Sequence, residues 1–135
     1  TDVVAEVHNV HHPVGAGKYY HEQKDEALDA ADSFRNARLP KYLGYFESAL
    51  GVNEGPFVLG DAWSHVDTSL FQLVEGLTYA FPRRMAALKA DYPRLHAMRE
   101  AVAAIPPIAG HLPSPRRTSF NEDGTFRHYP ELDAA

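Results

Sequence analysis

Three side chains that can act together in catalysis stand within four positions of one another. Ser64, His65 and Asp67 lie in the stretch 60–77, beside the single tryptophan of the chain. A Ser-His-Asp triad needs the histidine between the hydroxyl and the carboxylate, but adjacent residues of a helix point in different directions. Ser64 and Asp67, three positions apart, match a capping box, in which each side chain binds the other residue's backbone amide. We therefore predict that Ser64 and Asp67 start a helix and that His65 takes no part in catalysis.

A group of histidines, His8, His11 and His12, lies near the start of the chain. His8 and His12 are one helical turn apart, which is the spacing of two metal ligands on a helix. The chain has no cysteine, and Glu6 points to another side of the helix, so neither adds a ligand. We predict no metal here, and we interpret the histidines as the polar lining of a cleft or an interface, with metal binding as the less favoured alternative.

No other set of polar residues completes an active site. The seven tyrosines combine apolar area with a polar tip and are expected mostly at the edge of the core. The pair Arg116-Arg117 could hold an anion, but a solvated surface pair is the commoner arrangement. The sequence contains neither a phosphate-binding loop nor paired acid and base carboxylates. We therefore predict no catalytic residue in this chain.

Composition points to one domain and excludes several classes of protein. The chain has 135 residues, of which 44% are hydrophobic and 23% charged, as in an average globular protein. Its formal net charge of -5 argues against nucleic-acid binding. No apolar run approaches the roughly 20 residues that cross a bilayer. We expect a soluble, cytoplasmic protein with neither nucleic-acid nor membrane partners. Because the chain starts without Met, apparently inside an element, we also expect a longer parent protein.

Helical spacing of apolar residues dominates the chain. It predicts helices over residues 2–12, 25–50 and 66–77, the last with an apolar stripe that begins at Val66, and two more between 82 and 105 with a break at Tyr92-Pro93. Pro40 removes a backbone donor inside the second segment, but the apolar pattern continues on both sides, so we predict a kink. From residue 109 onward, prolines alternate with scattered aromatic residues, which indicates an irregular tail that packs on a surface. The fold class predicted is all-α.

Three phrases of the sequence resemble the C-terminal helical domain of glutathione transferases. They are PKYLGYFESAL at 40–50, GPFVLGDAWSHVDTSLFQLVEGL at 55–77 and YPRLHAMREAVAAIPPIAGHLPS at 92–114. In that family a short loop leads into a Ser-x-x-Asp capping box, which opens the central helix, and a Tyr-Pro-x-Leu helix follows. The tail FNEDGTFRHYPELD is similar to that of bacterial sigma-, mu- or pi-like members. The resemblance implies a bundle of about five helices over residues 1–114 and an irregular tail over 115–135.

The resemblance also implies an enzyme whose catalytic half lies outside this chain. Family members join this helical domain to a thioredoxin-like domain, which binds glutathione and carries the Tyr, Ser or Cys that stabilises the glutathione thiolate. No segment here matches that second domain. The chain would then contribute the hydrophobic electrophile-binding site and part of a dimer interface, with glutathione as the co-substrate of the parent. We expect the isolated chain to bind no cofactor, to be inactive, and to form a dimer or larger assembly.

Residues near the N-terminus are the substrate-binding candidates that the resemblance implies. The first helix of the family's domain lines the electrophile site, and in this chain it offers Glu6, His8, Asn9 and His12. This helix often carries an acid that reaches the partner's glutathione, and Asn9 at such a position puts that role in doubt. Tyr19 or Tyr20 lies near the place where pi-like members carry a substrate-site tyrosine. Ser64 and Asp67 are carried over as the structural capping box.

Two other functions remain open from the sequence. Domains of this shape also occur as non-catalytic interaction modules in translation factors and aminoacyl-tRNA synthetases, although the tail ELDAA looks like the end of a protein. The chain could also be a separate helical bundle that binds hydrophobic ligands. The sequence upstream of Thr1 would discriminate among these functions, because a transferase requires a thioredoxin-like segment there.

Overall fold

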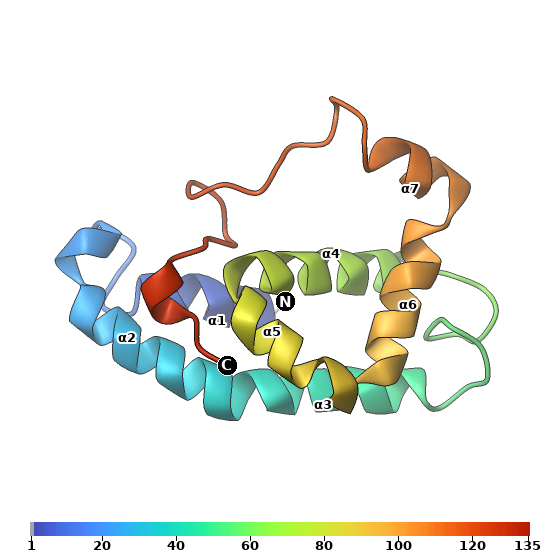
Figure 1. Ribbon diagram of the computed structural model, residues 1–135, viewed down its shortest axis with the longest axis horizontal. Helices are drawn as coiled ribbons and strands as arrows, with labels where there is room; N and C mark the ends of the chain where they lie inside the picture. The colour runs from blue at the N-terminus through green and yellow to red at the C-terminus, as the bar shows by residue number, and fades with distance from the viewer. Residues whose placement is uncertain (1) are drawn as a thin grey trace.

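The chain folds into a helical bundle with an irregular tail crossing one side (Figure 1). The computed structural model describes residues 2–135. Within these residues, five helices have ten or more residues, in agreement with the predicted bundle: α1 (Asp2–His11), α2 (Lys24–Ser33), α3 (Leu39–Leu50), α4 (His65–Ala80) and α6 (Pro93–Ala103). The described residues also form two short helices, α5 (Pro82–Leu88) and α7 (Pro106–His111), the single turns η1 (Tyr20–Glu22), η3 (Lys89–Asp91) and η4 (Pro130–Leu132), and a π-helical segment between α2 and α3.

The all-α prediction is confirmed over the described residues. Between residues 2 and 135, β pairing is limited to two isolated bridges, Phe57 with Gly60 and Leu59 with Ala62, in the loop before α4. Gly60 has a φ of 87° in this loop, a conformation that side chains disfavour. In the same part of the chain, no helix combines the length and the apolar character that a bilayer span requires.

The helices α2 and α3 follow one continuous path through a π-helical segment, η2 (Phe34–Arg38). In η2 the Leu39 N–H donates to the Phe34 carbonyl, a wider turn than an α-helix makes. Pro40 is the second residue of α3 and has no N–H to donate. The path changes direction at this junction (Figure 1). The departure from α-helical geometry therefore begins at residues 34–38, before the proline. The sequence analysis had placed the kink at Pro40 itself.

The start of α4 is fixed by a network around a fully buried carboxylate, that of Asp67. Asp67 Oδ2 accepts from the Ser64 N–H at 2.8 Å and from the Ser64 hydroxyl at 3.0 Å. Its other oxygen accepts from the Val58 N–H at 2.8 Å. The Val66 N–H donates to Ser64 Oγ at 3.3 Å, which completes the helix cap. Asp67 thus joins the helix start to the preceding loop, and its carboxylate is fully occupied in structural contacts.

The tail packs on α4 and α5 through aromatic and acidic side chains. The Phe126 ring lies over Gly76, where a Cβ atom would be only 2.5 Å from the ring, so α4 needs a glycine at this contact. Asp133 is buried and accepts from the N–H groups of Arg83 and Arg84, at 2.8 and 3.2 Å. These two donors are free amides of the first turn of α5, which a carboxylate stabilises. The tail therefore supports the end of α4 and the start of α5.

Candidate functional site

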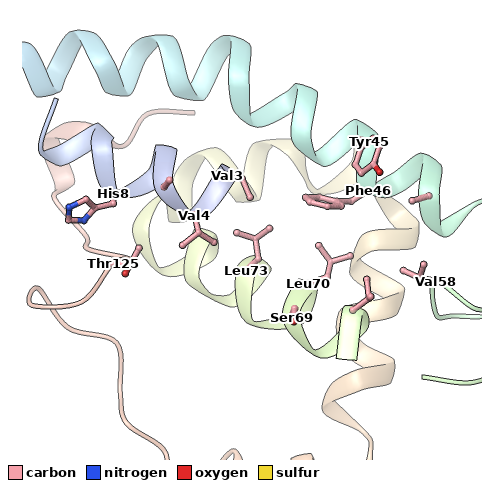
Figure 2. A pocket seen from close by; sticks show the side chains of 13 residues that line it. Val3, Val4, His8, Tyr45, Phe46, Val58, Ser69, Leu70, Leu73 and Thr125 are labelled. Carbon is pink, nitrogen blue, oxygen red and sulfur yellow. The ribbon is translucent and has the colours of Figure 1, made fainter. Parts of the chain in front are cut away.

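An apolar groove runs between α1, α3 and α4 (Figure 2). Its volume is about 820 Å³, within the range of small-molecule sites. The lining comes from all three helices, the loop before α4 and the tail: Val3, Val4, Ala5, His8, Tyr45, Phe46, Ala49, Val58, Val66, Ser69, Leu70, Leu73 and Thr125. In Figure 2, His8 and Thr125 lie at one end, and Phe46 and Val58 toward the other.

The groove has a buried floor and an exposed rim. Val3, Leu70 and Leu73 belong to the core and form the floor. Tyr45 on α3 is 70% exposed, and its ring packs edge-on against Phe46 at 5.5 Å. Val66, which the sequence analysis assigned to the apolar stripe of α4, is 45% exposed. Val66 shares the groove face of α4 with Leu70 and Leu73, but it lies in the first turn of the helix and at the exposed rim.

The polar groups of the groove are few and do not form a reactive pair. The Ser69 hydroxyl donates to the His65 carbonyl at 2.7 Å, inside its own helix. The Thr125 carbonyl lies 3.1 Å from a ring nitrogen of His11. Among the described lining residues, no hydroxyl is hydrogen-bonded to a histidine or carboxylate that could act as its base. The groove can therefore hold an apolar molecule by contact, and it offers no assembled nucleophile.

The substrate-binding candidates on α1 separate into two directions. His8 lines the groove, and the His12 ring stacks on it with the centroids 5.0 Å apart. Asn9 faces a different hollow of about 270 Å³, together with Glu6 and Arg38. The structure thus brings His8 and His12 to the end of the groove and turns Asn9 toward the second hollow.

Glu6 is the carboxylate of α1 beside that second hollow, and it is engaged within the bundle. Its oxygens accept from Arg38 Nε at 2.9 Å and from the Tyr42 hydroxyl at 2.5 Å. The hydrogen bond from Arg38 is the main reason why the pKa of Glu6 lies below its usual range, against a smaller opposing effect of burial. Glu6 therefore ties α1 to the junction of η2 and α3.

The two tyrosine candidates lie outside the groove lining. Tyr19 is 74% exposed and stacks on His21. Tyr20 is buried, stacks on Tyr129 at 3.8 Å and donates to Glu131 at 2.9 Å. Burial, followed by this hydrogen bond, raises the pKa of Tyr20 well above that of an ordinary tyrosine. Tyr20 thus anchors the tail to the loop after α1.

The three histidines gather where α1 ends. His11 is 2% exposed, and its Nδ1 lies 2.6 Å from Nδ1 of His12. Because a carbonyl only accepts, His11 Nε2 carries the proton that is donated to Thr125. Burial lowers the pKa of His11 to about 4, so its ring is neutral at pH 7. The ligand nitrogens of the three rings lie within 4.8 Å of one another.

Sequence reasoning missed the rim of the groove on α3. Tyr45 and Ala49 are four positions apart and both line it, beside the stripe that faces the core. Such a second apolar pair on an otherwise amphipathic helix was a usable signal, since residues at this spacing share one side of the helix. Val58 and Thr125 gave no comparable signal, because only the tertiary fold brings the loop and the tail to this place.

A family model described as "Glutathione S-transferase, C-terminal domain" matches residues 8–115. The chain belongs to that family. A curated glutathione S-transferase of Plasmodium yoelii yoelii is 30% identical over 88 residues, which are 65% of this chain and 40% of the relative. The chain thus spans about 40% of the length of that relative. The region matched by the family model contains the α3 and α4 walls of the groove and the capping box.

Proposed function

We propose that this chain is the electrophile-binding part of a glutathione transferase. Its apolar groove would hold the electrophile, and glutathione would be bound and activated by a thioredoxin-like domain of the parent protein. The groove itself is the observation that carries this proposal, because it is apolar, of small-molecule size and without an acid and base pair. Family membership supplies the reaction class, the attack of a glutathione thiolate on a small electrophile.

Apolar side chains left uncovered near the groove support a further domain or a second copy in the parent. Leu59 and Trp63, in the loop before α4, are large and exposed, and so is Val66. Grouped exposed apolar residues are typical of surfaces that another body covers. We propose a homodimeric, cytoplasmic parent. For the isolated chain we predict a dimer or larger assembly, and sedimentation at one monomer mass over a wide concentration range would contradict this.

A matched pair of variants tests the groove. Tyr45→Glu adds a charge at the rim of the groove, and Tyr19→Glu makes the same change at a similarly exposed tyrosine outside it. We expect an uncharged fluorescent probe such as Nile red to bind the native chain saturably. Tyr45→Glu should weaken this binding by about tenfold through lost apolar contact and an added charge, and Tyr19→Glu should not. Equal effects of the two variants would refute the groove as the binding site.

Activity measurements test whether this chain binds the electrophile while the thioredoxin-like domain activates glutathione. We expect the isolated chain to show no conjugation of glutathione to a chlorodinitrobenzene-type electrophile above the uncatalysed rate. Joining it to a family thioredoxin-like domain should restore turnover that Tyr45→Glu reduces. Turnover by the chain alone would contradict the proposal. A native parent that lacks a thioredoxin-like domain would favour the non-catalytic interaction module.

A further inference from the structure

The histidine cluster at the end of α1 consists of three ring side chains whose nitrogens lie within 4.8 Å of one another. His8 projects from the last turns of α1, His11 ends the helix, and His12 follows it directly. The chain turns here, with the His12 N–H donating to the Asn9 carbonyl at 3.3 Å. This turn brings His12 onto His8 and against His11. The nitrogens of three imidazoles thereby lie within 4.8 Å of one another, where the spacing of His8 and His12 alone predicts two ligands.

The buried member of the cluster is oriented by the tail. His11 Nε2 donates to the Thr125 carbonyl at 3.1 Å, and this fixes the ring and leaves Nδ1 with its lone pair toward His12. Metal-binding histidines commonly donate their second ring nitrogen to a backbone carbonyl in this way, which sets the tautomer of the ligand. His11 is therefore already arranged as a ligand, with a partner from a segment 114 positions away.

We propose that His8, His11 and His12 bind one divalent transition-metal ion of the zinc type. Imidazole suits zinc, copper and nickel, and three protein ligands leave a fourth position for water or another ligand. His8 and Thr125 also line the apolar groove, so the ion would lie at its end. This site goes beyond the proposed transferase function and does not depend on it.

Modest side-chain movement is enough to form the site. With zinc–nitrogen bonds of about 2.0–2.1 Å, tetrahedral ligands lie about 3.3–3.4 Å apart. The 2.6 Å contact between His11 and His12 must therefore open, and the most distant pair, within 4.8 Å, must close. His8 and His12 are only half-buried and can make these adjustments by rotation, while His11 stays held by the tail.

The positive charge of Arg127 lies near the cluster and disfavours a cation there, so a substitution of Arg127 can test the site. Arg127 is close enough to lower the pKa values of His11 and His12, in both cases after the larger effect of burial. Its guanidinium donates to the carbonyls of Gly124 and Asp123, at 2.7 and 3.5 Å. Removing this charge should favour an ion in the cluster without removing any ligand.

The experiment is calorimetric titration of Zn²⁺ into the chain, with the purification tag removed and without chelating buffer components. We expect one ion per chain. Loss of a residue that only hydrogen-bonds a metal ligand weakens metal binding by roughly 10- to 100-fold. The double variant His8→Gln/His12→Gln removes two ligands and should therefore weaken zinc binding by more than this. His111→Gln, an exposed histidine at the end of α7, is the matched control and should bind as the native chain does.

A second variant keeps the test independent of folding. Arg127→Gln should tighten binding by about two- to fivefold, the size expected for one partly screened charge. Circular dichroism establishes that each variant is folded. The assignment is overturned if the native chain binds no ion with one-to-one stoichiometry, if the double variant binds as tightly as His111→Gln, or if Arg127→Gln leaves the affinity unchanged or lower.

Discussion

The start of α4 and the end of α1 both bring together residue types that are common in active sites and metal sites. The two regions differ in how the polar side chains are hydrogen-bonded within the fold. At α4, Asp67 is fully buried, and both of its carboxylate oxygens accept hydrogen bonds from the cap and the preceding loop. At α1, His11 and His12 have their nitrogens only 2.6 Å apart, with His8 stacked beside them. Ser64 and Asp67 thus form a helix cap that leaves the His65 side chain outside it, and three histidines form a cluster whose ring nitrogens lie within 4.8 Å of one another.

The difference shows that residue type alone does not identify a functional site. A polar side chain whose hydrogen bonds are all made inside the fold contributes to stability. A ring nitrogen whose hydrogen bond goes to another histidine, as between His11 and His12, can exchange that bond for a metal ion. On this view, mutations at the cap should change stability and leave zinc binding unaltered, while mutations at the histidine cluster should mainly weaken zinc binding and have a smaller effect on stability.

The largest effect is expected at the cap. Asp67→Ala leaves the buried N–H groups of Ser64 and Val58 without their acceptor, and should lower the free energy of unfolding by about 3 kcal/mol. Urea denaturation measures this change. The zinc affinity of the folded variant should equal that of the native chain, and a loss below about 1 kcal/mol would show that the Asp67 network does not fix the helix start.

His11→Leu should have a smaller effect on stability and a large effect on zinc. The leucine fills the buried space, but the Thr125 carbonyl loses its donor, at a cost of about 1–2 kcal/mol. Zinc binding should disappear at the same time. If the variant lost as much stability as Asp67→Ala and kept its zinc affinity, the contrast between the two regions would be wrong.

Ser64→Ala should lower the free energy of unfolding by about 1 kcal/mol, as is typical for an N-cap residue. The backbone N–H of Ser64 still donates to Asp67 in this variant, so most of the network survives. The measurement is again urea denaturation, beside Asp67→Ala. A loss equal to that of Asp67→Ala would assign the main role to the hydroxyl and not to the buried carboxylate.

The smallest effect is expected at His65, the histidine between the two capping residues. Its side chain is exposed, so His65→Gln should change the free energy of unfolding by less than about 0.5 kcal/mol. It should also leave zinc binding unaltered. A strong effect on either measurement would return the Ser-His-Asp stretch to the list of functional candidates.

The sequence predicts a region well when the residues in contact there are close together along the chain. The contact of Ser64 with Asp67 spans three positions and depends only on helix geometry, which local spacing predicts well. The helices themselves follow from apolar spacing, and the all-α prediction is confirmed. The π-helical turn at residues 34–38 was not predicted, because the sequence marks the proline and not the preceding residues that adjust to it.

The histidine cluster and the groove depend on contacts that no local pattern encodes. His11 meets Thr125 across 114 positions, and the groove joins residues from α1 to the tail. His8 and His11 share one side of α1 at a spacing of three positions, and His12 meets both because the chain turns sharply after α1. In the same way, the exposure of Val66 follows from the open groove beside it.

The central proposal is that this domain holds the electrophile and that a thioredoxin-like domain of the parent protein holds glutathione. Displacement of Nile red from the isolated chain is the most direct test of it. The competitors are an unreactive dinitrobenzene, which represents the electrophile, and glutathione itself. Because the groove is apolar and without a reactive pair, the account predicts that the dinitrobenzene displaces the probe and that glutathione does not. Displacement by glutathione, or none by the dinitrobenzene, would contradict it.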